Sequence, residues 1–261
     1  MRIARYTTGQ DPTYGIVTED ENGHQVLAEV QGDPLYQPIT YTGVQVPLED
    51  ARLLAPVIPR SKVVGIGKNY ADHVAEMGGS TPPAEPLIFL KPNTSVIGPG
   101  EPIVLPRQSS NVHFEGELAV VIGRICKDVP PARVHEVIFG YTCANDVTAR
   151  DLQSGDGQWS RAKGFDTFCP LGPWIETELD PGDLALTTRL DGTMVQDDRT
   201  SSLVHDVAAI VAHVSAAFTL LPGDVILTGT PAGVGRILAG QRVEVEIEGI
   251  GTLSNPVVSR D

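Results

Sequence analysis

The stretch Val112-His113-Phe114-Glu115-Gly116-Glu117-Leu118-Ala119-Val120-Val121-Ile122-Gly123 places two carboxylates two residues apart at the start of an apolar run. Leu118 to Ile122 is apolar and largely β-branched, which predicts a buried β-strand. On an extended chain residues i and i+2 point to the same side, so Glu115 and Glu117 lie side by side. Gly116 between them lets another backbone or a ligand approach closely. Two like charges near a core repel each other unless a cation lies between them, so the pair indicates a divalent-metal site.

Apolar runs predict this strand and others along the chain. We expect them at 63–67, 87–90, 117–123, 137–144, 184–190, 225–229 and 243–248. One helix is predicted from Ser202 to Phe218, because its apolar residues recur about every 3.6 positions. His205 and His213 would belong to that helix as surface or packing residues rather than as ligands. Residues 68–79 are expected to form one or two helical turns that glycines end.

The chain divides by composition into two expected units. Residues 1–58 alternate short apolar segments with turns and predict a small β-rich N-terminal domain, and residues 59–261 form the larger one. The 27 glycines and 21 prolines, with mostly short strands between them, favour a β-rich α+β fold.

The charge balance and the cysteines limit the partners and the compartment. With 33 acidic and 19 basic residues the net charge is −14, and no basic stripe is present, so we expect neither a nucleic-acid nor a membrane partner. The three cysteines form no CxxC pair, which is typical of free thiols in a reducing compartment. No apolar stretch approaches the roughly 20 residues of a membrane span, and the N-terminus lacks a signal-peptide core. We therefore expect a cytoplasmic protein.

A third acid is the natural partner of the two glutamates. Asp146 follows the apolar strand expected at 137–144, where side chains from separate strands can converge while the strands hold them rigid. Three carboxylates and water form the oxygen-rich ligand set that Mg²⁺ and Mn²⁺ prefer. Acids on a solvated strand end give the same pattern in so acidic a chain.

Three other segments carry residues suited to catalysis or binding. If residues 68–79 are helical, His73 and Glu76 share a face, and the carboxylate can orient the imidazole as a general base; an exposed helix histidine is the simpler alternative. Lys163, flanked by glycine and aromatic residues, could stabilise an oxyanion or could be a solvated loop lysine. The backbone amides of the loop 227–235, with sequence LTGTPAGVG, could bind an anion, or its glycines could serve tight turns alone.

The order of the motifs is more specific than any one of them. GKNYADHVAEMG, PLIFLKPNTSVIGPG, VHFEGELAVVIGR, GYTCANDVTARDLQ, DGQWSRAKGFDTFCPLGPWI and TLLPGDVILTGTPAGVG follow one another along the chain. In this order they resemble the fumarylacetoacetate hydrolase family over roughly residues 61–258. The resemblance implies a mixed β-roll catalytic domain, usually dimeric, that holds Mg²⁺ or Mn²⁺.

The same resemblance assigns expected roles residue by residue. The expected metal ligands are Glu115, Glu117 and Asp146; the expected catalytic residues are Lys163 and the water-activating pair His73 and Glu76; and the expected substrate-binding residues are Tyr70, Phe89, Lys91, Gln153, Asp166 and Thr230.

The resemblance also implies a reaction class. We expect action on a small 2-oxo (or enol) dicarboxylic acid through a metal-bound enolate, with a C–C bond cleaved by acylpyruvate hydrolysis or oxaloacetate-type decarboxylation. A 2-hydroxyhepta-2,4-diene-1,7-dioate or 5-carboxymethyl-2-hydroxymuconate isomerase of aromatic catabolism is the alternative within the family. A non-catalytic metal- or carboxylate-binding protein is the alternative outside it.

Overall fold

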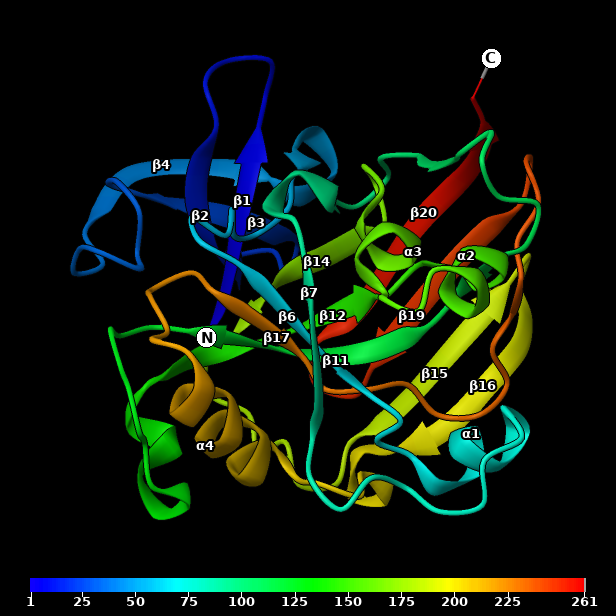
Figure 1. Cartoon of the computed structure of the whole chain (residues 1–261). Helices are drawn as coiled ribbons and strands as arrows, with labels where there is room; N and C mark the ends of the chain where they lie inside the picture. Colours follow the sequence, from blue (N-terminus) through cyan, green and yellow to red (C-terminus); the bar gives the residue numbers. More distant parts are fainter. Residues whose placement is uncertain (261) are drawn as a thin grey trace.

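A large, mostly antiparallel sheet runs through the centre of the molecule (Figure 1). The computed structural model describes residues 1–260. The sheet has twelve strands, and its path leads from the N-terminal strands to β7. In path order the strands are β4 (Tyr41–Pro47), β3 (Gln25–Val30), β2 (Thr13–Glu19), β1 (Arg2–Thr7), β14 (Cys169–Glu176), β12 (Ile138–Asn145), β11 (Gly116–Ile122), β17 (Val225–Leu227), β6 (Val63–Gly67) and β7 (Leu87–Lys91), with β5 (Arg52–Leu53) on β1 and β8 (Val96–Ile97) on β14.

Two smaller sheets and short helices complete the fold. The five-stranded sheet has the order β16 (Thr193–Arg199), β15 (Ala185–Leu190), β19 (Arg242–Ile247), β20 (Gly251–Ser259) and β9 (Ile103–Leu105). The three-stranded sheet has the order β13 (Thr148–Ala149), β10 (Val112–Phe114) and β18 (Gly235–Arg236). The α-helices are α1 (Ala71–Glu76), α2 (Arg150–Gly155), α3 (Ser160–Gly164) and α4 (Val207–Ala217), and the 3₁₀ helices are η1 (Leu48–Asp50), η2 (Asn93–Ser95), η3 (Pro131–Glu136) and η4 (Thr200–Ser202).

Strand β11 is the centre of the core, and all seven of its residues are buried. Its side chains alternate between two hydrophobic clusters. Val120 and Ile122 belong to the cluster that includes Ile210 of α4, whereas Ala119 and Val121 belong to the cluster on the opposite face. Burial on both faces explains why this segment is a continuous apolar run rather than an alternating one.

The β-rich fold class is confirmed, and a strand occupies each expected range with small shifts at its ends. The expected helix from Ser202 to Phe218 is partly wrong, because α4 begins only at Val207. The Asp206 carboxylate accepts the backbone N–H of Ala209 at 2.8 Å and caps the helix there. His213 lies in α4 as expected, but His205 precedes it, with its ring at 3.0 Å from the carbonyl of Pro83. No helix within residues 1–260 is long and apolar enough to cross a membrane.

The N-terminal strands extend the central sheet. Strand β1 pairs antiparallel with β14, with Arg2 opposite Glu176 and Ile3 opposite Ile175. Strands β2, β3 and β4 then follow β1 in order (Figure 1). The backbone of residues 1–58 is therefore continuous in hydrogen bonding with the strands that carry the acidic residues described below.

Candidate active site

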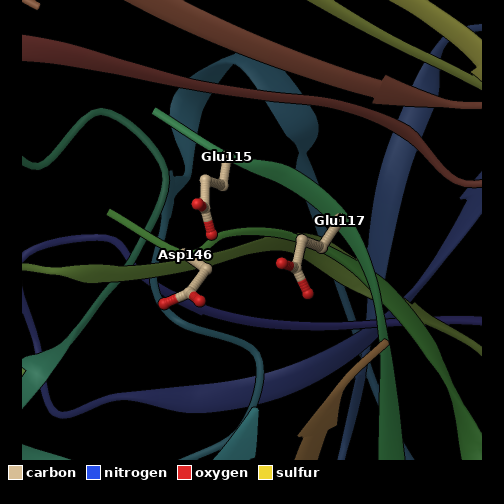
Figure 2. Close-up of side chains that lie close together, drawn as sticks. All are labelled: Glu115, Glu117 and Asp146. Atoms are coloured by element: carbon tan, nitrogen blue, oxygen red, sulfur yellow. The ribbon is translucent and has the colours of Figure 1, made fainter. Parts of the chain in front are cut away.

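The three carboxylates predicted as metal ligands lie together on the wall of one cavity. One oxygen of Glu115, one of Glu117 and one of Asp146 all lie within 4.8 Å of one another. The carboxylates face a common point, from two neighbouring ribbons (Figure 2). Each residue is at most 3% exposed. These are buried acids, so the alternative of solvated acids at a strand end does not describe them.

Strand pairing places the third acid beside the first two. Gly116 of β11 is opposite Asn145 of β12, and the next backbone N–H, that of Asp146, donates to the carbonyl of Glu115 at 2.8 Å. The Asn145 side chain also accepts the backbone N–H of Glu115 at 2.9 Å. The two chain segments are thus fixed to each other at the point where the carboxylates project.

Three cations bind two of these carboxylates. The Lys163 ammonium donates to Glu115 Oε2 at 2.7 Å and to Asp146 Oδ2 at 2.5 Å. The Lys91 ammonium donates to Asp146 Oδ1 at 2.5 Å, and Arg150 donates to Glu115 Oε1. Glu117, by contrast, accepts the backbone N–H of Gly229 at 2.7 Å and has no ion-pair partner among residues 1–260.

This unequal pairing separates the pKa values of the two glutamates. Burial alone would raise the pKa of Glu115, but the charges of Arg150 and Lys163 outweigh it and hold that pKa below its ordinary value. Burial and the charges of Asp146 and Glu115 raise the pKa of Glu117 well above its ordinary value. Burial lowers the pKa of Lys163, yet Asp146 and Glu115 more than offset it, so the net shift is upward. Glu117 is the carboxylate whose charge lacks a compensating cation.

The donor set fits a divalent cation. Three converging carboxylates supply the hard oxygen ligands that Mg²⁺ and Mn²⁺ take. A carboxylate offers about four lone-pair positions, so the bonds from lysine and arginine leave donor capacity on each group. A cation between the carboxylates would also offset the repulsion that acts on Glu117. Glu115, Glu117 and Asp146 are therefore the residues that could hold the metal.

His73 lines the same cavity and is paired with Glu76. Both lie on α1, with His73 Nδ1 at 3.2 Å from Glu76 Oε2. The other carboxylate oxygen, Glu76 Oε1, accepts the backbone N–H of Gly233 at 3.0 Å. His73 is 6% exposed and lines the cavity, so it is not an ordinary exposed helix histidine. In the neutral imidazole, Nδ1–H would donate to the Glu76 carboxylate, which leaves Nε2 as the nitrogen that can accept a proton.

Several other expected site residues also lie on this cavity, whose volume is about 200 Å³. Pockets for drug-sized ligands measure roughly 300–1,000 Å³, so this one suits a small acid. The lining includes Phe89, Gln153, Lys163 and Thr230 from the expected set. The Thr230 hydroxyl donates to the carbonyl of Gly116 at 2.9 Å, so its one hydrogen is used within the protein.

Three expected substrate-binding residues, Tyr70, Lys91 and Asp166, are not among those that line this cavity. Tyr70 is 1% exposed, and its backbone pairs with Leu203. The side chain of Lys91 is fully buried and binds Asp146, one of the three carboxylates that could hold a metal. Asp166 is exposed and lines a separate hollow beside Thr167. Their substrate-binding roles stay predictions, because motif proximity placed the residues near the site without giving their direction.

Arg150 and Gln196 are parts of the site that the sequence analysis did not identify. Arg150 lies in the motif that contains Asp146, so its proximity was available as a signal. Gln196 of β16 gave no such signal, because it lies 80 residues from its partner Gly116. Its side-chain oxygen accepts the backbone N–H of Gly116 at 3.0 Å, and its amide nitrogen donates to the Thr230 hydroxyl and the Pro231 carbonyl, both at 2.8 Å. Gln196 therefore holds the residue between the two glutamates and the loop beside them.

Replacing Gln196 by leucine tests this positioning role. We expect Q196L to bind Mn²⁺ about 10- to 100-fold more weakly, as is usual when a group that orients metal ligands is lost. The Gly116 N–H would lose its acceptor, and the glutamates on either side of it would lose their fixed geometry. Titration with Mn²⁺ followed by electron paramagnetic resonance measures the affinity. Q45L, at an exposed glutamine of β4, is the control, and equal Mn²⁺ affinity in both variants would contradict the role.

Comparison with known proteins agrees with the motifs. Residues 62–258 match the family described as fumarylacetoacetate (FAA) hydrolase, C-terminal, and residues 1–56 match an Rv2993c-like N-terminal family. The chain belongs to the fumarylacetoacetate hydrolase family, and the prediction from the sequence is confirmed. Protein Rv2993c of Mycobacterium tuberculosis is 57% identical over 265 residues, which cover 100% of this chain and 99% of that protein.

Relatives with described activities include an isomerase, a tautomerase and a hydrolase. The structure of 5-carboxymethyl-2-hydroxymuconate delta-isomerase from Mycobacterium smegmatis is 53% identical, with a TM-score of 0.92 and full coverage of both chains. The mitochondrial oxaloacetate tautomerase fahd2 of Xenopus laevis is 43% identical over 79% of this chain and 68% of that protein. Maleylpyruvate hydrolase from Sphingobium sp. SYK-6, in complex with manganese(II) and pyruvate, is 31% identical with a TM-score of 0.81 and full coverage of both chains. The family fold is therefore shared, and a relative with that fold holds a divalent metal.

Proposed function

We propose that this protein is an Mg²⁺- or Mn²⁺-dependent enzyme that cleaves a C–C bond in a small 2-oxo (or enol) dicarboxylic acid, with acylpyruvate hydrolysis as the best-supported reaction. One observation carries the proposal: His73, which is paired with Glu76, lines the same cavity as the three carboxylates. Hydrolysis requires a base that activates water, whereas decarboxylation of oxaloacetate does not. The manganese- and pyruvate-bound maleylpyruvate hydrolase supports the same chemistry.

The residues of the cavity have separate tasks in this reaction. The divalent cation, when bound by the carboxylates, supplies Lewis acidity toward the oxygens of the 2-oxo acid. His73 Nε2 takes a proton from water, and the resulting hydroxide adds to the acyl carbonyl. The C–C bond then breaks, its electron pair passes to the pyruvate fragment as an enolate, and the proton held by His73 returns to the enolate carbon. The products are a carboxylic acid and pyruvate.

Lys163 and the aromatic wall support the charged steps. The Lys163 ammonium lies 4.9 Å from the centre of the Phe89 ring, and Phe89 in turn packs edge-on against Trp159 at 5.4 Å. Aromatic walls keep water away from the ammonium, so its charge acts more strongly on a developing oxyanion.

A turnover panel tests the proposal directly. The purified protein, with Mg²⁺ or Mn²⁺ and with EDTA as the metal-free control, is given acetylpyruvate, fumarylpyruvate, oxaloacetate and 2-hydroxyhepta-2,4-diene-1,7-dioate. We expect metal-dependent release of pyruvate from an acylpyruvate. Turnover of the dienedioate alone would favour the second candidate, an isomerase, which the 53% identical isomerase from Mycobacterium smegmatis supports. Metal binding with no turnover of any compound would favour a non-catalytic metal- or carboxylate-binding protein.

Replacing His73 separates hydrolysis from the other reactions. We expect H73A to slow acylpyruvate hydrolysis by about 10²- to 10⁴-fold, the usual contribution of a positioned general base. Oxaloacetate decarboxylation should change much less, because it needs no activated water. Steady-state rates on both substrates measure the difference, with H213A on α4 as the control. Equal losses on the two substrates would show that His73 packs α1 in place rather than activating water.

The expected homodimer and cytoplasmic location remain predictions, and light scattering on the purified chain tests the first of them.

A further inference from the structure

Lys68 has an uncommon backbone conformation at the edge of the cavity. It follows β6 directly, lines the cavity and is exposed to solvent. Its φ angle is 59°, in the left-handed region, where glycine or asparagine fits at lower free energy than lysine. Residues held in such conformations concentrate at sites of function. The lysine side chain is therefore a candidate for a role that glycine could not fill.

The surrounding structure fixes this conformation from both sides. A side chain at Gly67 would meet the Trp159 ring, since a Cβ there would lie 2.7 Å from it, so the strand end is packed against the cavity wall. On the other side, the Asn69 amide donates to the carbonyls of His205 and Thr228 at 2.9 and 2.8 Å. Asn69 Oδ1 also accepts the backbone N–H of His205 at 2.8 Å. Lys68 thus lies between two anchored residues, and its backbone is held in place.

The charges around the cavity leave Lys68 available for a ligand. Three lysine or arginine side chains line the cavity: Lys68, Arg150 and Lys163. Arg150 is bound to Glu115 and Gln153, and Lys163 is bound to two carboxylates. Within residues 1–260 the Lys68 ammonium has no acceptor or ion-pair partner. It is the cation on this cavity whose charge is not already used by the protein.

We infer that Lys68 binds the second carboxylate of the substrate and so selects dicarboxylic over monocarboxylic 2-oxo acids. The inference rests on the proposed function, which places the 2-oxo end of the substrate at the acidic side of the cavity. A second carboxylate at the other end needs a cation or hydrogen-bond donors to replace its water. Thr230 has no free hydroxyl hydrogen for it. Lys68 is exposed, so solvent weakens the ion pair, and it acts on selectivity rather than on bond cleavage.

Two ligands that differ only in the second carboxylate test this inference. 2-Oxopentanedioate and 2-oxopentanoate have the same chain length, and neither is an acylpyruvate. Calorimetric titration of the metal-loaded protein should show tighter binding of the dicarboxylate, and we expect K68M to weaken it about three- to fivefold. The affinity for 2-oxopentanoate should change less than about twofold, because that ligand has no group for the ammonium. K68R should retain the preference, and K68G should lose it like K68M while allowing the left-handed backbone.

Controls separate this inference from a general charge effect and from the proposed function. K127M removes the same charge at an exposed lysine that is bound to the carbonyl of Ala216, and it should leave both affinities unchanged. A wild-type protein that binds both ligands equally, or a K68M variant that keeps the preference, would overturn the role of Lys68. Failure of the proposed function would appear differently, as absent turnover of every 2-oxo acid by the wild-type protein.

Discussion

Replacement of Glu117 by glutamine should abolish metal binding and turnover without destabilising the metal-free protein. Glu117 is 2% exposed, has no cationic partner within residues 1–260 and is repelled by two neighbouring carboxylates. Glutamine keeps the size of the side chain and an oxygen that accepts the Gly229 N–H, so the loop contact survives. Removing the charge removes the repulsion but also one ligand of the metal. We expect turnover to fall at least about a thousandfold, since a metal contributes several kcal/mol to charge stabilisation.

Two measurements on E117Q separate these effects. Mn²⁺ titration reports the lost affinity, and thermal unfolding in EDTA reports the stability of the metal-free fold. The midpoint in EDTA should equal or exceed that of the wild type, whereas the upward shift that metal gives the wild type should disappear. A lower midpoint in EDTA would mean that the Glu117 charge stabilises the fold, contrary to the contacts described here.

Replacement of Asp146 by alanine should have the opposite effect on the metal-free protein. Asp146 binds the ammonium groups of Lys91 and Lys163 at 2.5 Å each. The side chain of Lys91 is fully buried, and without Asp146 its remaining acceptor is the Val147 carbonyl at 3.3 Å. Breaking a buried pair by removing one partner costs about 3–5 kcal/mol. For a chain of this size that is a fall of roughly 10 °C in the unfolding midpoint.

A double variant shows whether the loss of stability in D146A is caused by the buried Lys91, which has lost its carboxylate partner. D146A should unfold earlier in EDTA and lose both Mn²⁺ binding and turnover, and D146A/K91M should recover part of the stability but none of the activity. Equal unfolding midpoints for D146A and the double variant would contradict this explanation. The comparison with E117Q then distinguishes two acids that are alike as ligands but opposite in their effect on folding.

The sequence predicted those parts of the fold whose signal is local. Strands β11, β12 and β17 are apolar runs because both of their faces are buried, and the run itself is the signal. Strand β14 was not predicted, because Pro170, Gly172 and Pro173 give it the composition of a loop. It is nevertheless fully buried, since its neighbours β1 and β12 supply the pairing. Those partners are distant in sequence, so no window around β14 could reveal them.

The candidate site likewise has parts that the sequence predicted and parts that it did not. The two glutamates followed from the alternation of an extended chain, and the contact of His73 with Glu76 followed from helical spacing. The residues that hold this site in place, Lys91 and Gln196, did not follow from the sequence. Lys91 lies 55 residues from Asp146 along the chain, and Gln196 lies 80 residues from Gly116. Only the order of the strands and the packing of β16 near β11 bring these residues together. Motif order supplied the family, but it could not tell which side chains reach the cavity.

The packing around Gly116 has a consequence for how such an enzyme can change. A Cβ at that position would lie 2.1 Å from Thr188 Oγ1 of the five-stranded sheet, so the segment bearing the glutamates is wedged between sheets and tolerates no added atom. Two residues that line the cavity, Lys68 and Met77, are instead exposed to solvent. Substitutions of these two side chains can change what enters the cavity while the buried carboxylates and His73 stay in place. The tightly packed segment at Gly116, together with exposed side chains that can be replaced, gives a physical reason why one architecture includes an isomerase, a tautomerase and a hydrolase among its members.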